Sequence, residues 1–253
     1  DVYKRQRDTL NRSDPAYDGK LAFYDAEEEV CVGVLVFAER YRRLEKKMAV
    51  QEKDPCRKVE LTAISRVLAR VPAQPASSFH EALQMVWLMQ VIPQIESNGF
   101  SISLGRLDQY CWPYLKADLA AGTITLEQAQ ELLDLLWLKF CEILRVDSRD
   151  AAEVNAGYYV AGQNIEVGGV DRGGHDCTNL LSYLCLNANR HIQLHQPNFT
   201  IRLHAGTPQE FLDHAVGSIA CGNGMPQVLN DAVIIQHLRH SSSGGTGLYR
   251  CRL

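Results

Sequence analysis

The first third of the chain has the hydrophobic spacing of helices. Within 38–48, apolar residues recur every three or four positions among Arg, Lys and Glu, which is the period of an amphipathic helix. The apolar run at 27–37 fits either a buried helix or a strand. Asp54-Pro55 interrupts the pattern, which resumes over 56–69. We therefore predict mostly helical structure for 17–69.

A loop and a second kind of helix follow. Residues 71–78 contain two prolines and two serines and read as a loop. Ser78 at its end is a natural N-cap for a helix over 79–92, and Glu81 stands at the third helical position, as in a capping box. That helix is apolar nearly all round, so we expect it to be buried.

The remainder alternates between strand and helix patterns. Strand-like stretches, with alternating apolar residues or flanking glycines and prolines, lie at 96–106, 157–169 and 199–203. Helical stretches lie between and after them, at 107–121, 126–143, 178–191 and 208–220. Gly122 ends the first of these helices, Thr125 and Gln128 start the second, and Thr207-Pro208 is expected to cap the last. This order predicts an α/β barrel or a doubly wound sheet.

The amino-acid composition limits the classes of binding partner that can be expected. The 253 residues are 46% hydrophobic and 22% charged, with a net charge of -4. Such a balance gives no broad basic surface, so we expect neither nucleic acid nor a membrane as partner. The longest apolar stretch, 30–38, is far shorter than the roughly 20 residues that cross a bilayer. The polar start has no signal-peptide core, and a cytoplasmic location is expected.

The cysteines and histidines do not indicate a metal site. Eight cysteines occur without any C-x-x-C pair, so we expect no zinc ribbon or iron–sulfur cluster, and mostly reduced core residues. His191 and His195 have a spacing that can place two ligands on one helix face. Pro197, however, predicts that the helix ends near His191, and we expect structural or exposed histidines instead.

Five ordered stretches resemble one family. They are RKVELTAISRVLARVPAQPASSFHEALQMVW, IESNGFSISLGRLDQYCWPYL, GQNIEVGGVDRGGHDCTNLLSYLCL, QPNFTIRLH and GNGMPQVLNDAVII. Each is similar to the corresponding stretch of glycyl radical enzymes, the pyruvate formate-lyase and glycerol dehydratase superfamily. The resemblance runs over about 38–238. It implies an α/β fold, namely a fragment of a ten-stranded α/β barrel with many surrounding helices, in which this chain supplies part of the first of two antiparallel five-stranded halves.

The resemblance also implies a domain division. Residues 13–240 are expected to form a partial pyruvate formate-lyase-like domain, with N-terminal helices and the first half-barrel. The sequence patterns at the two ends differ from that of the rest of the chain. Residues 1–12 are expected to be a non-native or disordered start, and residues 241–253 an aberrant tail.

The chemistry implied by the resemblance depends on a protein radical. In the family, a radical S-adenosylmethionine activating enzyme places a radical on a glycine, which passes it to a cysteine whose thiyl takes hydrogen from the substrate. Both radical residues are expected outside this fragment, so no catalytic residue and no bound cofactor are predicted within it. Cys251 stands near the expected place, but it lies between Arg250 and Arg252 and lacks the Gly-Cys-Val-Glu context. A full-length homodimer is expected.

Four residues are substrate-binding candidates. The resemblance places Ser101 where the dehydratase branch presents a side chain to the substrate. Tyr158 could line the pocket with its hydroxyl, and Gln163 and Asn164 carry amides on a glycine-flanked strand. Each also has a structural interpretation, as a strand, core or barrel residue.

Arg106 and Asp108 follow Gly105, where the predicted strand gives way to a helix. We expect this pair mainly to fix the junction through an ion pair or a cap.

The implied activity is that of a lyase or dehydratase acting on a small hydroxylated substrate such as glycerol, another diol, hydroxyproline or a choline-like alcohol. The phrase SISLGRLDQY resembles the dehydratase branch more than pyruvate formate-lyase. Pyruvate formate-lyase (formate C-acetyltransferase) and an inactive truncated product or scaffold remain the alternatives.

Overall fold

The computed structural model describes residues 2–98, 102–144, 146, 148–154 and 162–242. The chain divides into two compact units, Asp1–Ala76 and Ser77–Leu253. Each unit is described by itself.

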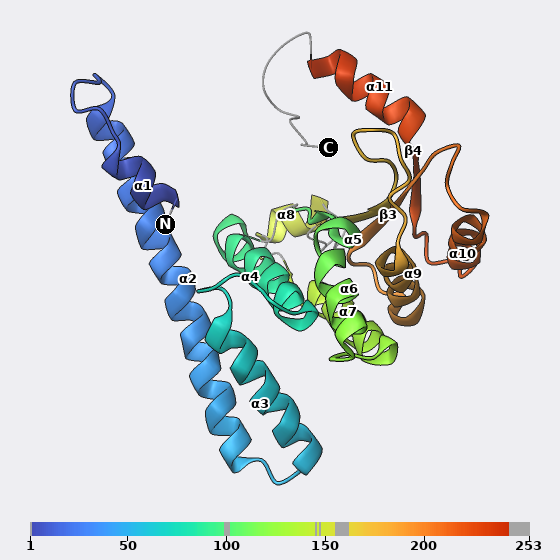
Figure 1. The fold of residues 1–253 in the computed structure, drawn as a ribbon, viewed down its shortest axis with the longest axis horizontal. Coiled ribbons are helices and arrows are strands. Elements are labelled where there is room, and N and C mark those ends of the chain that lie inside the picture. Colours follow the sequence, from blue (N-terminus) through green and yellow to red (C-terminus); the bar gives the residue numbers. More distant parts are fainter. Residues whose placement is uncertain (1, 99–101, 145, 147, 155–161, 243–253) are drawn as a thin grey trace. The chain divides into compact units, whose positions relative to one another are not determined.

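The first unit is helical. Helices α1 (Val2–Asp8), α2 (Tyr17–Gln51) and α3 (Pro55–Arg70) make it up, with α2 and α3 side by side (Figure 1). The Asp54 side chain accepts a hydrogen bond from the Cys56 N–H at 2.9 Å, and Pro55 occupies the first turn. These two residues start α3 at the interruption seen in the sequence. The ambiguous run 27–37 is helical, and the prediction for 17–69 is confirmed.

The second unit contains a four-stranded parallel sheet. Its strands are β1 (Gly105–Arg106), β2 (Asn164–Gly168), β3 (Asn198–Leu203) and β4 (Gln227–Asn230), in the order β1-β2-β3-β4 (Figure 1). The helices of this unit are α4 (Phe79–Ser97), α5 (Leu107–Tyr110), α6 (Trp112–Ala121), α7 (Leu126–Cys141), α8 (Arg149–Val154), α9 (Leu180–Ile192), α10 (Gln209–Ile219) and α11 (Asp231–Ser242). Parallel strands joined by helices confirm the α/β prediction.

One face of the sheet carries the core. Ile165, Val167, Phe199 and Ile201 alternate along β2 and β3 and are completely buried. Trp137 of α7 packs edge-on against Phe199, with ring centroids 5.9 Å apart. Helices therefore cover this face, and the alternate residues of the same strands point to the opposite face.

Helix boundaries largely follow local signals. Thr125 and Gln128 form a complete capping box, and Gly122 ends α6 with a φ of 66°. Ser78 caps α4 by accepting from the Glu81 N–H at 3.2 Å. The Glu81 carboxylate, however, accepts from Ser77 rather than from the Ser78 N–H, so only half of the expected box forms. Helix α4 also continues through Pro93 to Ser97.

Other expectations for this unit were wrong. The helix expected over 107–121 is broken at Cys111 into α5 and α6. The strand expected over 96–106 is reduced to β1, with Asn98 in a left-handed helix cap and 102–104 irregular. Thr207 does not cap α10, because its hydroxyl accepts from the His204 N–H at 2.9 Å.

Within the described residues, every helix is too short or too polar to cross a bilayer.

Candidate functional site

The face of the sheet opposite the apolar core carries polar side chains at its centre, of which two are half-buried and Thr200 is buried. Asn164, Glu166 and Thr200, which we call the polar face, alternate with the buried apolar residues of β2 and β3. The register sets Glu166 beside Thr200. The Thr200 hydroxyl donates to Asn164 Oδ1 at 3.0 Å, and Asn164 Nδ2 lies 3.4 Å from Glu166 Oε1. A half-buried carboxylate and amide, with the buried Thr200 hydroxyl bonded to the amide, are thus gathered on one side of the sheet, and such groups can orient a small molecule.

The two adjacent amides of the predicted site have separate surroundings. Asn164 belongs to the polar face, whereas Gln163 is completely buried. Gln163 Nε2 donates to the Phe140 carbonyl at 2.9 Å, and its Oε1 accepts from Gln90 at 2.8 Å. These bonds tie β2 to α7 and α4. A substrate contact of either residue stays a prediction, and Ser101 and Tyr158 lie outside the described residues.

Arg106 and Asp108 fix the start of the sheet through backbone groups. Arg106 donates to the carbonyls of Val170 and Gly168 at 3.0 and 2.7 Å. Asp108 accepts from the Gly168 N–H at 2.8 Å and from the Ser182 hydroxyl at 2.6 Å. Burial nevertheless raises the pKa of Asp108 above its usual value. Arg106 and Asp108 therefore fix the junction between β1 and α5, as expected, by bonding the backbone at the end of β2 and the Ser182 side chain of α9.

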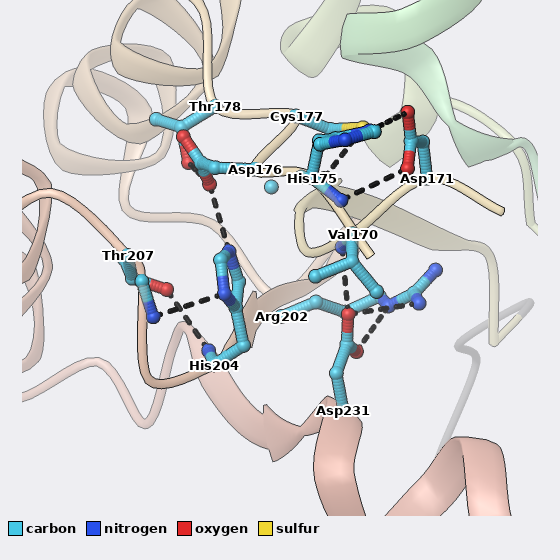
Figure 2. A network of polar contacts seen from close by, with 12 residues as sticks. Val170, Asp171, His175, Asp176, Cys177, Thr178, Arg202, His204, Thr207 and Asp231 are labelled. Carbon is cyan, nitrogen blue, oxygen red and sulfur yellow. Dashed lines mark hydrogen bonds and ion pairs between the residues drawn. The ribbon is translucent and has the colours of Figure 1, made fainter. Parts of the chain in front are cut away.

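A buried ion pair holds the carboxyl ends of the strands together. Figure 2 shows Asp231 between Arg202 and the backbone of Val170. The carboxylate lies 2.7 and 3.1 Å from two guanidinium nitrogens and accepts from the Val170 N–H at 2.8 Å. The side chains are only 5% and 2% exposed. This contact joins the loop after β2, strand β3 and the start of α11.

A second polar pair lies beside the first at the carboxyl ends of the strands (Figure 2). His204 Nε2 lies 2.9 Å from Asp176 Oδ1, and His204 Nδ1 accepts from the Gly206 N–H at 3.1 Å. In the neutral ring, these partners assign the proton to Nε2. The pair borders an open cavity of about 820 Å³ lined also by Val170, Asp231 and Ile235.

These residues were not among the sequence candidates. Arg202 lies in the predicted strand 199–203 and His204 directly follows it, whereas Asp231 follows β4, a strand that was not predicted. The carboxyl ends of parallel strands meet at one edge, and that rule could have directed attention to them.

The histidines at 191 and 195 do not share a helix face. Helix α9 ends at Ile192, before His195, and His191 Nδ1 pairs with Asp134 at 2.9 Å. Among the residues that the structure describes, His, Cys, Asp and Glu side chains nowhere form a group of three suited to a metal ion.

The cysteines are less buried than expected. Of the seven described, Cys111 and Cys185 are buried, while Cys31, Cys56 and Cys221 are exposed. Burial raises the pKa of Cys111 to about 12, so its thiol stays protonated. The expectation of mostly core cysteines was wrong, and Cys251 lies outside the described residues.

Comparison with known proteins agrees with this architecture. A family model described as pyruvate formate lyase-like matches residues 2–247. Isethionate sulfite-lyase from Nitratidesulfovibrio vulgaris is 36% identical over 218 residues, which cover 85% of this chain and 26% of that protein. The chain belongs to the pyruvate formate lyase-like family. The family resemblance of its five sequence stretches is thereby confirmed.

Solved structures of glycyl radical enzymes share the fold. The structure described for 1,2-propanediol dehydration in Roseburia inulinivorans has a TM-score of 0.91 and 39% identity, over 97% of this chain and 30% of that chain. A glycyl radical enzyme from Archaeoglobus fulgidus has a TM-score of 0.86 and 32% identity, over 95% and 31% of the two chains. The prediction of a barrel fragment is confirmed, and the chain spans less than a third of the length of these relatives.

Proposed function

We propose that this chain is part of a glycyl radical lyase or dehydratase that acts on a small hydroxylated substrate. Glycerol or another diol, hydroxyproline and a choline-like alcohol are the candidate substrates. The observation that carries the proposal is the polar face, Asn164, Glu166 and Thr200, on a sheet whose other face is a packed apolar core. In a closed barrel the polar face would line the interior, where a hydroxylated molecule could bind.

The residues of this chain would bind and orient the substrate rather than react with it. The half-buried Asn164 offers an amide that can bond substrate oxygens, and the buried Thr200 hydroxyl, which donates to Asn164, would orient that amide. The Arg202–Asp231 pair and the Arg106–Asp108 junction would keep the strands in place, because catalysis depends on accurate positioning. In the full-length enzyme, a glycyl radical relayed through a cysteine thiyl would supply the hydrogen abstraction.

The partners follow from the same proposal. A radical S-adenosylmethionine activating enzyme would install the radical, and the full-length protein would form a homodimer in the cytoplasm. The radical cysteine and glycine would lie in segments that the relatives possess and this chain does not contain.

The test uses the reading frame that contains this chain, extended to the length of the relatives and produced anaerobically with an activating enzyme. We expect a glycyl radical signal in electron paramagnetic resonance and the formation of a dehydrated or cleaved product from one of the candidate alcohols. A strong radical signal without turnover of any of them would contradict the proposed substrate class. If the extended protein carried no radical after activation, the alternative of an inactive truncated product would be favoured.

Pyruvate formate-lyase is the second candidate, favoured by the name of the family model. Its activity can be measured in the same preparation as the formation of acetyl-coenzyme A from pyruvate and coenzyme A. The segment Leu107–Tyr110 supports the dehydratase side by resemblance. In this chain Gln109 donates to the Cys177 carbonyl at 2.9 Å, so the segment contacts the backbone between β2 and α9. Acetyl-coenzyme A formation without alcohol turnover would select the acetyltransferase.

A further inference from the structure

Glu166 is a carboxylate whose acceptor capacity is largely unused. It lies in β2, half-buried, on the polar face between its strand neighbours. Its single described hydrogen bond is the 3.4 Å contact from Asn164 to Oε1, which is long for a charged acceptor. Within the described part of the chain, no Lys, Arg or His forms an ion pair with it. A carboxylate has two acceptor oxygens, so this one can accept further hydrogen bonds from a ligand.

The two arginines nearest in register have other partners. Arg106 pairs with Glu166 in the β1–β2 ladder, but its guanidinium donates to the Gly168 and Val170 carbonyls. Arg202, farther along β3, is held by Asp231. The terminal nitrogens of Arg106 and the guanidinium of Arg202 thus bond other acceptors, and neither arginine forms an ion pair with the Glu166 carboxylate within the described residues.

We propose that Glu166 determines specificity in the substrate chamber, by accepting a hydrogen bond from a hydroxyl or ammonium group and repelling sulfonate and carboxylate groups. This inference rests on the proposed function and narrows its substrate to a neutral or cationic alcohol. A fixed carboxylate stabilises a donor or a cation and destabilises an anion at the same distance. The relative named isethionate sulfite-lyase is named for a sulfonate, and this chain would belong to an enzyme with the opposite preference.

The role of Glu166 differs from that of its neighbours on the polar face. Thr200 is buried and donates to Asn164 at 3.0 Å, so it orients the half-buried Asn164 amide, which carries both a donor and an acceptor. Asn164 would therefore tolerate several substrates. An ionised Glu166 can only accept, so it discriminates by charge.

The experiment compares Glu166→Gln with wild type in the activated full-length enzyme. Substrates are 1,2-propanediol, choline and isethionate. We expect wild type to prefer one of the two alcohols without a negative charge over isethionate. Glu166→Gln should lower kcat/KM for the preferred substrate about 10- to 100-fold, chiefly through KM, as expected for the loss of a charged hydrogen bond. It should also reduce the discrimination against isethionate.

A matched control and a second measurement keep the outcomes separate. Glu131→Gln removes an exposed carboxylate from α7 and should leave all three kcat/KM values unchanged. Calorimetric binding of 1,2-propanediol, choline and isethionate to the full-length protein without activation needs no radical, so it tests the inference even if turnover is absent. Unaltered binding and turnover in Glu166→Gln, or tighter binding of isethionate by wild type, would overturn the role of Glu166. Missing radical and turnover, with binding that still depends on Glu166, would count against the proposed function alone.

Discussion

Arg202 and Asp231 form a buried ion pair that links β3 to the first residue of α11. Two guanidinium nitrogens lie 2.7 and 3.1 Å from the carboxylate, which also accepts from the Val170 N–H. Three segments separated in sequence thus meet at one carboxylate. Because both charges are removed from water, each depends on the other for its stabilisation.

Asp231→Asn should therefore destabilise the chain strongly. The substitution keeps the side-chain shape but leaves the Arg202 charge buried without a counter-charge, which costs about 3–5 kcal/mol. The free energy of unfolding can be measured by urea denaturation, with tryptophan fluorescence as the signal, because all three tryptophans of the chain lie in this unit. Glu153→Gln is the control, since it removes an exposed ion pair with Arg149 and should change little. Equal effects of the two variants would contradict the importance of the buried pair.

Gly169 approaches the same ion pair closely. Its φ is +79°, and a Cβ there would lie 2.7 Å from Asp231 Oδ2 and 2.9 Å from Arg202 Nε. Gly169→Ala should therefore add a steric clash to the backbone strain of a left-handed residue, which alone costs about 1–2 kcal/mol. The unfolding free energy of the variant measures the sum.

Gly174 separates those two effects. Its φ is +85°, but a Cβ there would meet nothing within 4 Å. Gly174→Ala should thus cost only the backbone strain, and Gly169→Ala should cost clearly more. If both variants lost the same stability, the close approach to the ion pair would have no energetic consequence.

Local signals explain why parts of this fold could be predicted from sequence. The start of α7 depends on Thr125 and Gln128, three residues apart, and each bonds the backbone of the other at 3.2 and 2.9 Å. Such a motif is complete within one helical turn. The same holds for Gly122, whose positive φ ends α6.

Contacts between distant segments explain the failures. Arg202 and Asp231 are 29 residues apart, and no periodicity connects them. Thr207 looked like a helix cap, but it is engaged by the His204 N–H, a competing local bond that sequence does not distinguish. Gln163 and Asn164 are adjacent and similar, and strand alternation places one in the helix-covered core and the other on the polar face.

Asp108→Asn should change how stability depends on pH. Burial raises the folded-state pKa of Asp108 above its ordinary value of 3.8, so folding favours the protonated carboxyl. That contribution is present below about pH 3.8 and is lost as pH rises through the folded-state pKa. The unfolding free energy of Asp108→Asn minus that of wild type should therefore increase as pH rises above about 3.8, as measured by urea denaturation.

Asp171→Asn provides a control of opposite sign. Hydrogen bonds from His175 lower the pKa of the exposed Asp171, so its stabilising contribution is present at neutral pH and is lost as pH falls. The same difference should then decrease, not increase, toward neutral pH. A flat profile for Asp108→Asn would show that its hydrogen bonds from Gly168 and Ser182 compensate its burial.

Substitutions of Gln163 and Asn164 should have different effects, the first on stability and the second on substrate affinity. Gln163→Met would leave the Gln90 amide and the Phe140 carbonyl without their buried partner, at a cost of about 1–3 kcal/mol in unfolding free energy. Asn164→Ala removes the hydrogen bond from Thr200 and the long one to Glu166, but Asn164 itself is only half-buried, so its effect on stability should be smaller. In the activated full-length enzyme, KM should rise for Asn164→Ala and stay unchanged for Gln163→Met. A raised KM with unchanged stability in Gln163→Met would instead place Gln163 in contact with the substrate, because loss of an enclosed structural amide cannot produce that combination.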